Sequence, residues 1–281
     1  MSETRTWLIT GASTGFGKHL AEVALERGDA VAATFRKQDQ ADAFTAHASG
    51  RAHGLLLDVT DSAAIEPAVE QVLAKLGHID VLVNNAGYGL IAAVEEASED
   101  AARAQFDVNV FGPLNLMQAV LPSMRERGSG HIMNMSSFGG VASFAGAGFY
   151  CASKFALEGL SEALAQEVAG MGIKVTLLEP GAFRTDWAGR SLKTSGDLDA
   201  YAESSRARKQ WLKNELDGAQ PGDPRKAAHA IVDLAYTDAP PLRAVMGDDA
   251  VAAVRAKLDA QLAELDAHAY PEKAFEFESV A

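Results

Sequence analysis

The chain has 281 residues, of which 48% are hydrophobic and 22% are charged, as in an ordinary globular protein. Its formal net charge of −13 argues against nucleic acid or an anionic membrane surface as a partner. The single cysteine cannot form an internal disulfide, and no apolar run approaches the length of a membrane span. Since the first predicted strand begins too early to leave room for a signal peptide, we expect a soluble, cytoplasmic protein.

Short apolar runs alternate with helical patterns along the chain, which is typical of βαβ units. Such units are right-handed and place helices on both faces of a parallel sheet. The predicted fold class is therefore α/β, a single doubly wound Rossmann-type domain. The predicted strands cover residues 7–10, 30–34, 52–57, 81–84, 131–135 and 174–178, and the predicted helices include residues 18–27, 62–76, 101–126 and 152–169.

No linker, low-complexity run or internal repeat divides the chain, so we expect one domain over residues 1–281. A glycine-containing, partly helical segment at about residues 183–224 is expected to be an insertion that covers the substrate. Apolar residues at helical spacing predict a C-terminal helix at about residues 248–267. No structure is predicted for the tail that contains Phe275 and Phe277.

A glycine-rich turn follows the first predicted strand and precedes a helical pattern. Glycine permits a tight turn and a close approach of the backbone to a ligand, and a helix N-terminus offers free N–H groups and a positive dipole. The turn therefore predicts the phosphate site of a dinucleotide, although such turns also occur without a ligand. Its residues are Thr10, Gly11, Ala12, Ser13, Thr14, Gly15, Phe16 and Gly17.

The residues after the second predicted strand indicate which dinucleotide binds. Sites that prefer NAD place an acidic residue here to bind the ribose hydroxyls, whereas this chain has Phe35, Arg36 and Lys37. The Arg36 guanidinium can bind a 2′-phosphate through paired, charge-assisted hydrogen bonds, which predicts NADP(H) rather than NAD(H). Alternatively, Arg36 and Lys37 belong to a solvated loop, and Lys18 either adds charge nearby or points to solvent.

Tyr150 and Lys154 have the spacing of residues that share one face of a helix. The lysine ammonium favours the phenolate and so lowers the pKa of the tyrosine, which suits it to general acid/base catalysis. The hydroxyl of Ser137 could hold a substrate oxygen beside this phenol, and Ser136 is the alternative. Taken alone, the pair also fits a packed ring and a solvated amine.

In their order along the chain, these motifs resemble those of the short-chain dehydrogenase/reductase family over about two-thirds of the length. The resemblance implies hydride transfer with Ser137, Tyr150 and Lys154 as the catalytic trio. It also implies that Lys154 binds the nicotinamide ribose, and that Asn109 bends its helix locally and holds a water that links Lys154 to solvent. Further residues implied at the cofactor are Asp58 and Val59 at the adenine, Asn85, Ala86 and Gly87 at the ribose and nicotinamide, and Pro180, Gly181 and Thr185 near the nicotinamide.

Together these features predict an NADP(H)-dependent oxidoreductase that interconverts a ketone or aldehyde with an alcohol. The alternatives are a dinucleotide-binding regulator without turnover, and an isomerase or dehydratase. No histidine or cysteine has metal-ligand spacing, so no metal is expected. We expect Cys151 to pack as a small apolar residue.

The residues that follow the predicted site motifs are mostly apolar, which predicts a medium-sized apolar or aromatic substrate. Arg184 and Arg190 could bind a substrate carboxylate, with solvent exposure or a cofactor contact as the alternatives. Broad apolar faces on the helices 101–126 and 152–169 suggest a homodimer or homotetramer. The candidate pocket residues are Tyr88, Leu90, Ile91, Phe138, Val141, Phe144, Phe149, Phe183 and Trp187.

Overall fold

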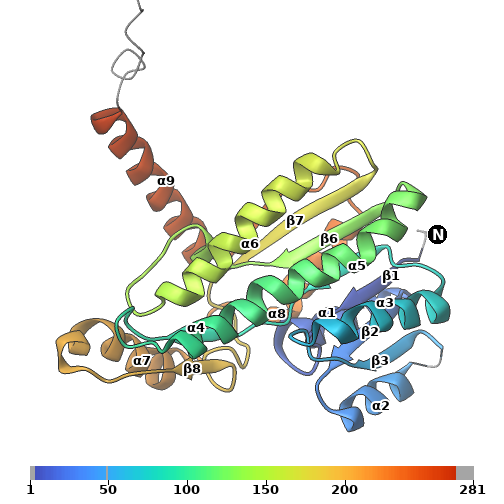
Figure 1. The fold of residues 1–281 in the computed structure, drawn as a ribbon, viewed down its shortest axis with the longest axis horizontal. Helices are drawn as coiled ribbons and strands as arrows, with labels where there is room; N and C mark the ends of the chain where they lie inside the picture. The colour runs from blue at the N-terminus through green and yellow to red at the C-terminus, as the bar shows by residue number, and fades with distance from the viewer. Residues whose placement is uncertain (1–3, 49, 270–281) are drawn as a thin grey trace, which may run out of the picture.

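A computed structural model describes residues 4–48 and 50–269, and its centre is a seven-stranded parallel sheet (Figure 1). The strand order β3-β2-β1-β4-β6-β7-β9 changes direction between β1 and β4, where a ligand site is expected outside the carboxyl ends of the strands. The strands are β1 (Thr6–Ile9), β2 (Ala30–Phe35), β3 (Ala52–Leu56), β4 (Val81–Asn84), β6 (Gly130–Met135), β7 (Ile173–Pro180) and β9 (Arg243–Met246).

Each face of the sheet is covered by helices that bury an apolar stripe. Successive side chains of a strand point to opposite faces, so Trp7 and Ile9 of β1 belong to one core, and Leu8 belongs to the other. The first core packs under α1 (Gly15–Arg27), α2 (Gln38–His47) and α8 (Pro224–Ala235). The second packs under α3 (Ser62–Leu76), α5 (Gly112–Arg127) and α6 (Gly148–Glu167). The predicted α/β fold class is confirmed.

The predicted helix over residues 101–126 is interrupted in the structure. It consists of α4 (Glu99–Phe106), a π-helical turn (Asp107–Phe111) and then α5. Ser98 begins α4, because its hydroxyl accepts a hydrogen bond from the Ala101 N–H. The π-helical turn directs the fully buried Asn109 toward the loop after β4. The apolar periodicity of the sequence did not reveal this turn.

Several short elements escaped prediction. The strands β5 (Gly89–Ile91) and β8 (Leu192–Thr194) form a separate two-stranded sheet. The strand β5 is buried but only three residues long, whereas β8 and β9 are partly exposed and lack the apolar pattern of a buried strand. Residues 199–216 form short helical turns around α7 (Ala207–Trp211). In Figure 1, α7 and β8 lie together beyond the ends of the main strands.

The helix α9 (Asp248–His268) extends away from the sheet (Figure 1). Its side chains Leu258, Leu262 and Leu265 are exposed. The tail residues Phe275 and Phe277 lie outside the described residues. Among the helices that are described, we find none with the length and apolar character needed to cross a membrane.

Candidate active site

The glycine-rich turn lies between β1 and α1, and its backbone leaves no space for larger side chains. Gly11 and Gly15 have φ values of +66° and +57°, which glycine adopts without strain. A Cβ on Gly17 would lie 2.6 Å from the Gly11 carbonyl oxygen and would collide with the Asn85 amide. That amide donates hydrogen bonds to the carbonyl oxygens of Thr10 (2.8 Å) and Gly11 (3.1 Å). The segment after β4 therefore fixes the shape of the turn.

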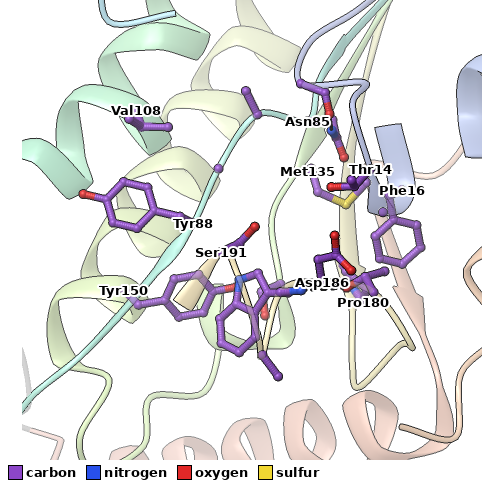
Figure 2. Close-up of a pocket in the computed structure, with 18 of the residues that line it drawn as sticks. Thr14, Phe16, Asn85, Tyr88, Val108, Met135, Tyr150, Pro180, Asp186 and Ser191 are labelled. Carbon is purple, nitrogen blue, oxygen red and sulfur yellow. Dashed lines mark hydrogen bonds between the residues drawn. The ribbon is translucent and has the colours of Figure 1, made fainter. Parts of the chain in front are cut away.

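A cavity of about 650 Å³ opens beside this turn, at the carboxyl ends of the strands. Figure 2 shows Tyr88 and Tyr150 on one side of it, with Thr14, Phe16 and Pro180 opposite. Of the predicted catalytic and cofactor-site residues, Thr10, Ala12, Gly17 and Asn109 do not line it. Those that do are Gly11, Ser13, Thr14, Gly15, Phe16, Arg36, Asp58, Val59, Asn85, Ala86, Gly87, Ser137, Tyr150, Lys154, Pro180, Gly181 and Thr185.

The predicted catalytic trio is brought together by two elements of the fold. Ser137 follows β6, where its hydroxyl oxygen accepts a hydrogen bond from the Gly139 N–H (3.0 Å). Tyr150 lies in the first turn of α6, and Lys154 lies one turn later. All three side chains are buried and line the cavity. The adjacent Ser136 lines the cavity too, so burial alone does not separate the two serines.

The environment of Tyr150 differs from the prediction that Lys154 lowers its pKa. Burial raises the pKa of Tyr150, and a hydrogen bond with Ser137 only partly opposes this. The Lys154 ammonium donates to the Met135 carbonyl oxygen (2.7 Å) and lies 6.0 Å from the centre of the Tyr150 ring. Burial lowers the pKa of Lys154 to about 8, although Glu158 raises it. Tyr150 therefore holds its proton at neutral pH, as a proton donor must.

Asn109 lies behind the cavity wall rather than in it. Its amide oxygen accepts from the Tyr88 N–H (3.2 Å), and its amide nitrogen donates to the Tyr88 carbonyl oxygen and the Ser153 hydroxyl (3.1 Å each). These bonds join the loop after β4 to α6. Asn109 thus ties the segment of Gly87 to the helix that carries the tyrosine and lysine.

At the far end of the cavity, the residues after β2 and β3 form the rim. Phe35 is buried against Phe44, with ring centres 5.4 Å apart, while Arg36 is exposed at the cavity edge. Asp58 accepts hydrogen bonds from the Thr60 N–H (3.0 Å) and hydroxyl (2.8 Å), so it stabilises a turn as well as lining the cavity. Lys18 does not line the cavity, and its ammonium lies 3.8 Å from Glu22.

Aromatic rings dominate the wall near Tyr150. The Trp187 ring lies 5.2 Å from the Tyr150 ring, and Phe138 and Phe144 are stacked at 5.5 Å. Of the nine candidate pocket residues, Tyr88, Phe138, Phe144, Phe183 and Trp187 line the cavity. The other four, Leu90, Ile91, Val141 and Phe149, do not.

The arginines considered for a substrate carboxylate are already engaged elsewhere. Arg190 donates to the Thr14 hydroxyl (2.9 Å) and lies 3.4 Å from Asp186, beside the glycine-rich turn. Arg184 donates to the Gln220 carbonyl oxygen (3.2 Å). The sequence did not point to Lys193, Arg208 or Trp211, which also line the cavity, because no motif indicates how residues 183–224 fold over it.

Cys151 and the grouping of possible metal ligands can also be compared with the sequence predictions. Cys151 is buried, and burial raises the pKa of its thiol, so it has neither the thiolate character nor the access of a reactive cysteine. In the part of the chain that the structure describes, no three His, Cys, Asp or Glu side chains are grouped to hold a metal ion.

Comparison with known proteins agrees with this geometry. The family model described as short chain dehydrogenase matches residues 5–195. Oxidoreductase BOA17 of Botryotinia fuckeliana is 41% identical over 88% of this chain and 90% of its own. The 3-ketodihydrosphingosine reductase of Bacteroides thetaiotaomicron is 42% identical over 85% of this chain and 87% of its own. A crystal structure of a short-chain dehydrogenase from Streptomyces avermitilis is 46% identical, covers 95% of this chain and 96% of its own, and superposes with a TM-score of 0.89.

The chain belongs to the short-chain dehydrogenase family. It is therefore an oxidoreductase with a nucleotide-binding Rossmann fold, as the motifs in the sequence predicted.

Proposed function

We propose that the protein is an NADP(H)-dependent oxidoreductase that interconverts a ketone or aldehyde with an alcohol. One observation carries the proposal. Ser137, Tyr150 and Lys154 meet at the cavity that also contains the glycine-rich turn. A proton donor and a dinucleotide site thus share one desolvated space, which is the arrangement that a reversible hydride transfer requires.

The residues of the glycine-rich turn fit a dinucleotide, because any side chain at Gly11 would press against Ala86 and fill the space beside the turn. Arg36 supports NADP(H), since it follows β2 at the rim and no acidic residue takes its place there. We assign the remaining cofactor contacts to Asp58 and Val59 at the adenine end, and to Asn85, Ala86, Gly87, Pro180, Gly181 and Thr185 toward the nicotinamide.

NADPH supplies the hydride when it is bound. In the reductive direction, Tyr150 gives its proton to the carbonyl oxygen as negative charge develops there. The Ser137 hydroxyl oxygen accepts from Gly139, and its hydrogen, which faces the Tyr150 oxygen when no substrate is present, donates to the same substrate oxygen once the substrate lies between them.

The Lys154 ammonium has enough N–H groups to bind both the cofactor and Tyr150. It uses one N–H on Met135, so two remain for the ribose and for the phenolate that forms. Asn109 bonds Tyr88 and Ser153, the residue before Lys154, from behind the wall and supports the relay that returns a proton to Tyr150.

The substrate is an apolar or aromatic carbonyl compound or the matching alcohol. The rings of Phe138, Phe144 and Trp187 support this assignment. We also propose that residues 183–224 cover the substrate, since Trp187, Leu212 and Leu216 line the cavity from this segment. The name of the Bacteroides relative, a reductase of a keto compound, agrees with the reaction type.

Two further properties are part of the proposal. The exposed side chains Phe111, Phe155 and Leu160 on the helices that carry the site suit a homodimer or homotetramer. The single, buried and unpaired cysteine suits the reducing cytoplasm.

The test follows NADPH absorbance with a panel of aliphatic and aromatic ketones, aldehydes and alcohols. We expect turnover by the native protein, and at least a ~100-fold loss of kcat in Tyr150→Phe, the lower range for a missing general acid. NADPH affinity, measured by fluorescence, should be unchanged in this variant. Tight NADPH binding without turnover of any compound would favour a dinucleotide-binding regulator. Normal activity of Tyr150→Phe would refute the mechanism.

A further inference from the structure

Arg208 in α7 lines the catalytic cavity from the covering segment and is half-buried. Its guanidinium carbon lies 4.8 Å from the centre of the Phe144 ring and 5.5 Å from that of Trp211. Within the described part of the chain, it has neither a hydrogen-bond acceptor nor an acidic partner. The rings of Phe144 and Trp211 contact this cation.

The two cations nearest to Arg208 in the sequence, Arg206 and Lys209, are placed differently. Arg206 lies 2.6 Å from Asp197 and 2.9 Å from Asp199. Lys209 donates to the Ser195 carbonyl oxygen at 2.7 Å and lies 3.6 Å from Glu96. Ion pairs thus hold the segment together on both sides of Arg208, and Arg208 takes no part in them.

The charge of Arg208 also reaches Cys151, the residue next to Tyr150 in the sequence. It acts on the Cys151 thiol, where it partly opposes the burial that raises the pKa of that group. Cys151 adjoins Tyr150 in the first turn of α6.

Arg208 contacts Phe144, whose ring stacks on that of Phe138, the residue after Ser137. In Figure 1, α7 lies away from α1 and β2, which adjoin the glycine-rich turn and Arg36. Arg208 is therefore on the substrate side of the cavity.

A guanidinium whose faces rest on aromatic rings still presents its N–H edge. That planar edge matches the two oxygens of a carboxylate, and stacking reduces the side-chain freedom lost when it binds. A cation that is partly desolvated without a partner is costly, and an anionic ligand offsets that cost. The cavity thus combines apolar and aromatic walls with one cation that can bind an anionic group of the ligand.

We propose that Arg208 binds a carboxylate of the substrate, so that the enzyme acts on keto acids or the corresponding hydroxy acids. The carbonyl lies at Tyr150, the apolar or aromatic body lies against Phe144 and Trp187, and the carboxylate pairs with Arg208. This inference rests on the proposed carbonyl reduction, and it narrows the substrate to compounds that carry an acid at a distance from the reacting carbon.

The test uses 3-benzoylpropionate, 4-benzoylbutyrate and 5-benzoylvalerate, each paired with its methyl ester, because the series varies the distance from ketone to acid. For the best chain length, we expect kcat/KM for the acid to exceed that for the ester at least ~10-fold, the lower range for a charged hydrogen-bonded contact. Arg208→Met should lower kcat/KM for the acid at least ~10-fold more than kcat/KM for the ester, so that the ratio of the two falls toward one. Arg208→Lys should restore part of the ratio.

Lys213→Met is the matched control, since it removes one exposed positive charge from the same segment outside the cavity. It should leave the ratio unchanged. Equal losses for acid and ester in Arg208→Met, or no preference for any acid in the native protein, would overturn the assignment.

A binding measurement separates this inference from the reaction itself. Quenching of tryptophan fluorescence by the same acids, with NADPH present, should show at least ~10-fold weaker binding in Arg208→Met. If no ketone is reduced but this difference is found, the carbonyl reduction is wrong and the carboxylate site stands. If binding is equal in both proteins, the carboxylate site is wrong whatever the turnover.

Discussion

Glu179 lies near the end of β7, directly before Pro180, and its carboxylate is fully buried without a hydrogen-bond partner among the described residues. The Arg243 guanidinium lies 3.6 Å from Glu179 but 3.0 Å from Glu158, so the closer pair leaves Glu179 poorly compensated. Burial and the nearby charge of Glu158 raise the pKa of Glu179 to about 7, although Arg243 lowers it.

This pKa predicts how the free energy of unfolding depends on pH. The reference pKa of the glutamate is 4.5, so the folded protein binds the proton more tightly than the unfolded chain does. Stability from this group is present below pH 4.5 and is lost as pH rises toward 7. At ~1.4 kcal/mol per pH unit, the loss is at most ~3 kcal/mol. His131 has the opposite effect, because burial lowers its pKa to about 3.

The free energy of unfolding is measured in urea for Glu179→Gln and for the native protein between pH 4.5 and 8. The difference between the two proteins at each pH gives the contribution of Glu179, because His131 is present in both. We expect the variant to become more stable relative to the native protein as pH rises, by up to ~3 kcal/mol at pH 8. Glu70→Gln, an exposed change on α3, should show no such trend. A difference between Glu179→Gln and the native protein that is constant across pH would refute the reasoning.

Three further predictions concern Arg36 at the adenine end of the proposed cofactor site, the glycine-rich turn and the proposed subunit interface. Arg36→Ala should weaken NADPH by ~1.5–3 kcal/mol in calorimetry and leave NADH unchanged, with Lys37→Ala as the control; equal losses for both cofactors would exclude the 2′-phosphate role. Gly17→Ala should cost ~1–3 kcal/mol of stability by urea unfolding, since its Cβ meets the Gly11 carbonyl at 2.6 Å, and unchanged stability would contradict that contact. Phe155→Lys should yield monomers in sedimentation, whereas an unchanged mass would place the interface elsewhere.

The sequence predicted the parts of the site whose positions follow from the order of motifs and strands along the chain. The glycine-rich turn must follow β1, and the ends of neighbouring parallel strands meet at one edge, so Ser137 and Gly87 could be placed together. The strand β9 was missed because Arg243 and its half-exposed neighbours have no buried pattern. A local bend at Asn109 was expected from the family resemblance, but apolar periodicity did not reveal the π-helical turn at Asp107–Phe111, because an extra residue in one turn barely changes that periodicity.

Other properties depend on the assembled fold and could not be deduced from spacing. The four-residue interval from Tyr150 to Lys154 suggested a lowered phenol pKa, but burial of the ring has the larger effect. Arg208 was missed for a similar reason. Its contact with Phe144 joins segments that are distant in sequence, and no local pattern predicts that contact.

The central claim is hydride transfer to a carbonyl carbon with Tyr150 as the proton donor. The most direct test supplies NADPH deuterated at nicotinamide C4, on the face from which the hydride leaves, with a ketone that the panel identifies as a substrate. We predict that the native protein places deuterium on the carbinol carbon of the alcohol, as detected by mass spectrometry. Tyr150→Phe, at equal cofactor occupancy, should form the labelled alcohol at least ~100-fold more slowly. Alcohol without deuterium, or label transfer at the native rate by Tyr150→Phe, would contradict the account.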